Sequence, residues 1–195
     1  MFTGIIEETA KVKNINKSDD FIILDIVSSI SNKLNIGDSV SINGVCLTVT
    51  EANKKYFRVN IIKETLNTTN LKEINVNSYV NIERALKLSS RIDGHILQGH
   101  IEDTVPIVDK KIFDKQVNYT VEVGEDLLKY CIKKGSIALD GISLTIANIS
   151  NDNIDVAIIP HTLEHTTLKY KEIGDILNLE TDMFAKYVEN IINIK

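Results

Sequence analysis

The chain has 195 residues, of which 43% are hydrophobic and 25% charged, and its formal net charge is −5. This acidic balance argues against a nucleic-acid surface, because phosphate binding needs clustered lysine and arginine. No apolar run approaches the roughly 18 residues of a membrane span, and no basic segment precedes an apolar one at the start, so we expect no membrane segment and a cytoplasmic protein. Two cysteines, Cys46 and Cys131, do not make a disulfide framework, and we expect both to be reduced thiols.

An internal duplication organises the chain. Residues 43–49 and 140–146 carry one pattern, Asn/Asp-Gly-x-Cys/Ser-Leu-Thr, and the offset between them is 141 − 44 = 97. The same offset relates residues 63–69 to 160–166 and 81–83 to 178–180. Two copies are too few for a solenoid, so we predict two tandem homologous domains.

The predicted elements repeat in the same order in both halves. Residues 22–26 and 119–123 alternate apolar and other side chains, which is typical of a half-buried strand. The further expected elements are strands over 5–15, 39–49, 56–62 and 79–83, with copies that include 99–105 and 176–180, and short helical turns at 28–34 and 125–134. The turn at 125–134 gives Cys131 a packing role. About six short strands per half favour a small antiparallel Greek-key barrel, whose closure removes exposed sheet edges.

We therefore predict an all-β fold of two tandem homologous six-stranded Greek-key antiparallel β-barrels with a C-terminal α-helix. The predicted domains are 1–94, 95–181 and 182–195, with a linker of some helical character at 84–94. The last segment is amphipathic and has Asp182 as a plausible N-cap. Its apolar residues are Met183, Phe184, Tyr187, Val188, Ile191 and Ile192. Such a stripe covers a barrel face or joins subunits, and we favour association.

Four motif positions change chemistry between the copies. A nucleophile, acid, base or cation stands in only one copy, as a reaction with two unlike partners in two like pockets requires. The changes are Cys46 to Ser143, Asn43 to Asp140, Gly37 to Lys134 and Ile5 to His100.

The motifs together resemble the riboflavin synthase family over essentially the whole chain. The resemblance is carried by Met1-Phe-Thr-Gly-Ile-Ile-Glu7, by the two copies of the repeated motif, by Lys63-Glu-Thr-Leu66 and by Gly94-His95-x-x-x-Gly99-His100. It implies a homotrimer in which the C-terminal helix helps assembly, and pockets formed by the first barrel of one subunit and the second barrel of its neighbour. It implies transfer of a four-carbon unit between two molecules of 6,7-dimethyl-8-ribityllumazine, giving riboflavin and 5-amino-6-ribitylaminouracil, with no metal or organic cofactor. It leaves open whether the protein associates with lumazine synthase.

The family chemistry removes a proton from the C7 methyl group of one lumazine and adds a nucleophile to C7 of the other. Cys46 is a candidate nucleophile, or a side chain that lines the pocket and hydrogen-bonds the substrate, and Ser143 is its counterpart in the other pocket. The alternative is that Cys46 is a small buried thiol without a role in the reaction. His100 is the candidate proton shuttle. Lys134 and Asp140 are expected to steady charge on the pyrimidine ring or to activate Ser143, and the alternative is a surface ion pair.

Further residues enter the predicted site through the resemblance. Ser39 and Asp182 align with polar residues that the family uses near the site. Phe2 is either a stacking residue or a core anchor, and His95 either orients its turn or is an ordinary loop histidine. The predicted substrate contacts are Gly4, Ile5, Ile6, Cys46, Leu47, Thr48, Asn60, Ile61, Ile62, Lys63, Glu64, Thr65, Gly99, His100, Ile101, Lys134, Ser143, Leu144, Thr145, Ile159, Pro160, His161, Thr162, Leu163 and Glu164.

Three rival functions are weaker. His161 and His165 have metal-ligand spacing, but Glu64 and Thr68 hold the matching positions and no third ligand stands out. A non-catalytic lumazine-binding protein of the same fold is the main alternative, although such proteins have lost polar site residues that are present here. An oligonucleotide-binding barrel is opposed by the charge balance and by an aromatic content of 6%.

Overall fold

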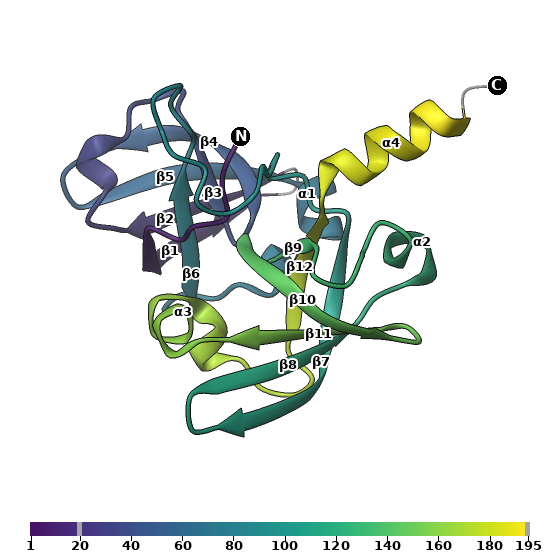
Figure 1. Ribbon diagram of the computed structural model, residues 1–195. Helices are drawn as coiled ribbons and strands as arrows, with labels where there is room; N and C mark the ends of the chain where they lie inside the picture. Colours follow the sequence, from purple (N-terminus) through teal and green to yellow (C-terminus); the bar gives the residue numbers. More distant parts are fainter. Residues whose placement is uncertain (19–20, 194–195) are drawn as a thin grey trace.

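A computed structural model describes residues 1–18 and 21–193 and shows two β-barrels packed together with a helix projecting from the second (Figure 1). Each barrel is closed and antiparallel, as predicted, and the strand order 1-2-5-4-3-6 repeats in both. In the first barrel the strands are β1 (Glu8–Lys17), β2 (Phe21–Val27), β3 (Ser39–Ile42), β4 (Val45–Ala52), β5 (Tyr56–Ile62) and β6 (Tyr79–Arg84). In the second they are β7 (Asp103–Phe113), β8 (Gln116–Glu122), β9 (Ser136–Leu139), β10 (Ile142–Ser150), β11 (Asn153–Ile158) and β12 (Ile176–Thr181).

Short helical segments close the barrel ends. The α-helices are α1 (Lys63–Thr68), α2 (Glu125–Leu128), α3 (Pro160–His165) and α4 (Met183–Asn193), and the 3₁₀ turns are η1 (Ser31–Lys33), η2 (Asn70–Glu73) and η3 (Thr167–Tyr170). The predicted C-terminal helix is α4; residues 194 and 195 lie outside the described part of the chain. The Asp182 carboxylate accepts a hydrogen bond from the Phe184 N–H at 3.0 Å, as expected of an N-terminal cap.

Each barrel has its own apolar core, built from the inward positions of its strands. Val12, Leu24 and Phe57 are buried in the first, and Val121 and Ile154 in the second. The inward positions alternate with exposed ones because successive side chains of a strand point to opposite faces. This alternation leaves the outer faces of the strands free to build a site.

Three predicted local features differ from the structure. The expected strand over 39–49 is two strands joined by the turn Asn43-Gly44, and the linker after β6 is extended and turned rather than helical. The first strand begins at Glu8 rather than at residue 5 because the residues before it leave the first barrel. These residues cross to the second barrel and form part of the candidate site.

No helix within residues 1–18 and 21–193 is both long enough and apolar enough to cross a bilayer.

Candidate active site

The two copies of the repeated motif meet at their turns. Asn43-Gly44 and Asp140-Gly141 have positive φ at both residues (47° and 84°, 47° and 76°), which is the conformation of a two-residue hairpin turn that asparagine, aspartate and glycine favour. A Cβ atom on Gly44 would lie 2.8 Å from the Gly141 backbone nitrogen, so the turns pack backbone against backbone. The two strands that carry Cys46 and Ser143 therefore start from one central contact between the barrels.

Each motif is covered by a segment that leads into the opposite barrel. The Ser143 N–H donates to the Gly4 carbonyl at 2.8 Å, and the Cys46 N–H donates to the Gly99 carbonyl at 2.9 Å. We call residues 1–6 and 97–101 the crossing segments. They pair with each other through Phe2 and Leu97, whose N–H and C=O groups exchange hydrogen bonds of 2.8 and 3.0 Å.

We call the two like groups of residues around Cys46 and Ser143 the candidate pockets, and each combines residues predicted separately from the sequence. Gly4 lies on Ser143 and is followed by Ile5 and Ile6, whereas Gly99 lies on Cys46 and is followed by His100 and Ile101. The side chains of Ile6 and Ile101 pack against the cores of the opposite barrels. Phe2 is buried in a small cluster with Leu97 and Ala138, which is the anchoring alternative rather than an exposed stacking surface.

Two buried glutamates hold the crossing segments. Glu83 accepts hydrogen bonds from the Thr3 N–H, the Thr3 hydroxyl and the Gly4 N–H at 2.6, 2.7 and 2.9 Å. Glu180 accepts from the N–H groups of Gln98 and Gly99 at 2.7 and 3.0 Å. Burial raises the pKa of both carboxyl groups, and the hydrogen bonds oppose that shift.

These glutamates were not predicted as site residues. The signal that pointed to them is their repetition, since residues 81–83 and 178–180 match at the offset of the duplication.

Strand alternation creates the outer surface of each pocket. On β4, Cys46 is half-buried and Thr48 exposed, while Leu47 points into the core; Ser143, Leu144 and Thr145 repeat this on β10. Cys46 therefore shares an outer face with Thr48, and Ser143 shares one with Thr145.

The ends of β5 and β11 lie beside these faces. Val49 pairs with Val59, so the register brings Ile62 level with Cys46. Ile146 pairs with Val156, and the same count brings Ile159 level with Ser143. The exposed predicted residues of these ends are Asn60, Ile62, Lys63, Glu64, Ile159, Pro160, His161 and Glu164; Thr65, Thr162 and Leu163 are half-buried and Ile61 is buried.

A histidine and a serine are hydrogen-bonded in the second pocket. His95 Nδ1 lies 2.7 Å from Ser143 Oγ. Burial lowers the pKa of His95, and the nearby Asp182 carboxylate acts in the opposite direction, so the imidazole is neutral near pH 7. His95 Nε2 is buried and has no hydrogen-bond partner within residues 1–18 and 21–193. A neutral imidazole on a hydroxyl is the arrangement of a general base with its nucleophile.

Cys46 in the first pocket has different surroundings. Its thiol is free, and its side chain makes no hydrogen bond among the described residues. Cys131 is free and buried, as the packing role requires, and burial raises its pKa to about 11. Only Cys46 of the two is therefore partly accessible.

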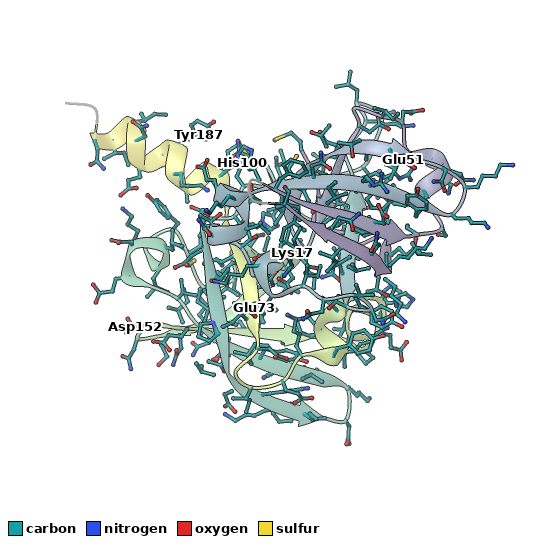
Figure 2. All side chains as sticks on the ribbon, turned by 180° about the vertical axis from the view of Figure 1, so that it is seen from behind. Lys17, Glu51, Glu73, His100, Asp152 and Tyr187 are labelled. Carbon is teal, nitrogen blue, oxygen red and sulfur yellow. The ribbon has the colours of Figure 1, made fainter. Side chains whose placement is uncertain are left out.

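His100 is exposed on the edge of the molecule from which α4 extends (Figure 2). Ser39 and Ile5 line a cavity of about 630 Å³ beside the linker, together with Glu83 and Arg84. This cavity lies next to the crossing segment of residues 1–6. It is not lined by Cys46 or Ser143.

The remaining predicted cation and acid lie apart. Lys134 is exposed, with φ of 70°, at the position where the first copy has Gly37. Asp140 is fully buried, and its nearest cation is Lys171 at 3.4 Å, so a surface ion pair with Lys134 is not what forms.

His161 and His165 lie one turn apart on α3. Their rings stack with centroids 4.2 Å apart, and His165 Nδ1 is hydrogen-bonded to the His161 carbonyl at 2.8 Å. No cluster of three potential metal ligands is found in the described part of the chain.

Comparison with known proteins agrees with this architecture. The lumazine binding domain family matches residues 3–85 and again residues 98–182. Curated riboflavin synthases are similar along almost the whole chain: that of Actinobacillus pleuropneumoniae is 41% identical over 98% of this chain and 90% of its own. That of Bacillus subtilis (strain 168) is 38% identical over 99% and 90%, and that of Escherichia coli (strain K12) is 40% identical over 93% and 87%.

Solved structures of LumP have the same fold. LumP complexed with riboflavin superposes with a TM-score of 0.86 at 26% identity, and LumP complexed with 6,7-dimethyl-8-(1'-D-ribityl) lumazine with 0.84 at 25%. Each alignment covers 93% of this chain and 99% of the LumP chain. The domain match, the relatives along the whole chain and the paired pockets agree: the chain belongs to the riboflavin synthase family.

Proposed function

We propose that the protein catalyses the riboflavin synthase reaction, in which two molecules of 6,7-dimethyl-8-ribityllumazine give riboflavin and 5-amino-6-ribitylaminouracil. The observation that carries this proposal is the pair of like pockets with unlike side chains, Cys46 under Gly99 and Ser143 under Gly4. One lumazine must lose a proton from its C7 methyl group while the other accepts a nucleophile at C7. Like pockets suit the identical substrates, and unlike side chains suit their different roles.

The substrate rings are proposed to lie on the outer faces of β4 and β10. Cys46 and Thr48 share one such face, and Ser143 and Thr145 the other. The hydrogen bonds from the Cys46 and Ser143 N–H groups to the Gly99 and Gly4 carbonyls hold the backbone of each motif in one place. The polar groups are therefore positioned before the substrate binds. Holding two substrates in fixed orientations replaces a bimolecular encounter with an oriented one.

Ser143 is proposed as the nucleophile of the second pocket and His95 as its base. As Ser143 Oγ bonds to C7, its proton passes to Nδ1 of the neutral imidazole, which returns it when the C7–O bond breaks. The support is the 2.7 Å contact between Nδ1 and Oγ together with the lowered pKa of His95. Cys46 and His100 serve the second lumazine in the other pocket.

A homotrimer is proposed to complete the site. Five apolar side chains of α4 are each more than half exposed, which supports the proposal that this helix is an association surface: Phe184, Tyr187, Val188, Ile191 and Ile192. Cavities of about 630 and 440 Å³ lie at the linker and beneath α4, and neither is lined by Cys46 or Ser143. The two motif faces carry the exposed side chains of Thr48 and Thr145, and we propose that the first barrel of one subunit faces the second barrel of the next.

The cytoplasm is the proposed compartment. Cys46 and Cys131 are both free thiols, the state that reducing compartments maintain. Cell fractionation followed by immunoblotting tests this assignment.

The rival function is lumazine or flavin binding without turnover, since LumP has the same fold and has been crystallised with riboflavin. The curated riboflavin synthases are more similar to this chain, and Cys46, His95, Lys134 and Ser143 are all present. Purified protein given 6,7-dimethyl-8-ribityllumazine should release riboflavin, detected by its absorbance and fluorescence after chromatography. Tight binding of the lumazine without any riboflavin would support the rival.

A further inference from the structure

Asp140 lies between the two barrels and is out of reach of any substrate. Its side chain is 0% exposed. Its Oδ1 accepts hydrogen bonds from the Asn178 N–H at 2.8 Å and from the Asn70 side-chain amide at 2.7 Å. Its Oδ2 lies 3.4 Å from Lys171 Nζ, whose side chain is 19% exposed. Asn70 belongs to the first barrel, so the carboxylate connects both halves of the molecule.

The first copy builds the same turn without a charge. Asn43 holds the position of Asp140, and its Oδ1 accepts from the Asn81 N–H at 2.8 Å, as Asp140 Oδ1 accepts from Asn178. The counterpart of Lys171 is Ile74, because 171 − 97 = 74. A neutral amide and an apolar side chain in one copy are thus replaced together by a carboxylate and an ammonium group in the other.

Removing one partner of a buried ion pair is destabilising, because the other charge is left largely buried and uncompensated. Here the pair ties the turn Asp140-Gly141 to Lys171, which precedes β12 in the same barrel. The Asn70 amide binds the same carboxylate from the first barrel at 2.7 Å. Ser143 lies two residues after Gly141, and its N–H donates to the Gly4 carbonyl at 2.8 Å. A shift of the turn would therefore move the Ser143 hydroxyl relative to His95.

We propose that Asp140 and Lys171 are positioning residues, which place Ser143 against His95 without touching substrate. The pair is specific to the second barrel, where the nucleophile and its base stand. This inference rests on the proposed function for its kinetic consequences, although the Ser143–His95 contact itself can be observed without turnover.

The test is to replace Asp140 and Lys171 by the uncharged residues that hold these positions in the first copy, asparagine and isoleucine. Asp140→Asn, Lys171→Ile and the double variant are compared, with Lys169→Ile as a control because Lys169 is an exposed lysine of the same segment. We expect each single variant to unfold at lower temperature and to lose about tenfold in kcat, with KM within about twofold, because misplacement of a reacting group lowers the rate rather than the binding. The double variant should regain most of both, and the control should match the parent protein.

An NMR readout follows the positioning directly. The ring signals of His95 report its hydrogen bond to Ser143, so they should shift in each single variant and return in the double variant. This measurement distinguishes the two proposals. A parent protein that binds lumazine without turnover would refute the proposed function, whereas the His95 signals of the single and double variants would still test the positioning role.

Two results would overturn the inference. In one, the double variant regains its unfolding temperature and its His95 signals but stays as slow as Asp140→Asn, which would mean that the carboxylate itself serves the reaction. In the other, Asp140→Asn leaves the unfolding temperature, kcat and the His95 signals unchanged, which would mean that the pair positions nothing.

Discussion

Replacing Gly99 by alanine tests whether the crossing segment must lie directly on the motif. A Cβ atom there would lie 2.7 Å from Cys46 Cβ and 2.9 Å from the Cys46 backbone nitrogen, and the φ of 77° disfavours any side chain. The left-handed backbone conformation costs about 1–2 kcal/mol, and overpacking against fixed backbone costs a further ~1–3 kcal/mol. Gly99→Ala should therefore lower the free energy of unfolding by about 2–5 kcal/mol.

Gly174 supplies the matched control. Its φ of 95° carries the same backbone cost, but a Cβ atom there would meet no atom within 4 Å. Urea unfolding should show Gly99→Ala less stable than Gly174→Ala by about 1–3 kcal/mol, and riboflavin formation should fall in Gly99→Ala alone because Cys46 is displaced. Equal losses of stability in the two variants, or full activity in Gly99→Ala, would refute the close packing of the crossing segment on Cys46.

Three further predictions follow from the two pockets and α4. Because burial lowers the pKa of His95 below its ordinary 6.5, the acid limb of kcat/KM should lie below pH 6.5 and disappear in His95→Gln. The folded state should also lose stability as the pH falls below 6.5, since the unfolded state then binds more protons than the folded state. An acid limb that persists unchanged in His95→Gln would exclude this base. Cys46→Ser should lose far more activity than Cys131→Ser in initial-rate assays, and equal effects would remove the role of Cys46. Ile191→Glu places a charge on an exposed apolar helix face, so light scattering should show a smaller species than the parent protein; an unchanged mass would place the association surface elsewhere.

The repeat made the fold predictable, because two halves with the same pattern of short strands confirm each other. Local errors came from positions where turn chemistry competes with hydrophobic pattern. The hydrophobic pattern predicts one strand over residues 39–49, although the Asn43-Gly44 dipeptide within it is the residue pair that a two-residue hairpin favours. The linker was expected to have helical character, but Ala85 and Leu86 lie in an extended path beside the first crossing segment, where the Leu86 N–H donates to the Met1 carbonyl at 3.0 Å.

The candidate site was predicted in its parts and not in its assembly. Comparing the copies pointed to Cys46 and Ser143, yet a sequence comparison does not show that each motif is covered by the segment leading into the opposite barrel. His95 gives only a weak sequence signal, because it stands before Gly99, where the matching between the copies begins, and so has no counterpart in the repeat. The changed charge at Asp140 is apparent from the copies, and so is the change from Ile74 to Lys171, but Lys171 lies 31 residues further on, since 171 − 140 = 31. That the two side chains face each other is visible only in the fold.

Two like pockets, contributed by two subunits, are proposed to act together on two substrates. Cys46→Ala and Ser143→Ala proteins, each inactive by itself, should regain activity after they are unfolded together and refolded as mixed oligomers. If first and second barrels of neighbouring subunits form each site in a ring, about a quarter of the sites will contain both intact pockets. Recovery of riboflavin formation near that level is the predicted result. Mixed oligomers that remain inactive would show that the two pockets do not meet across subunits.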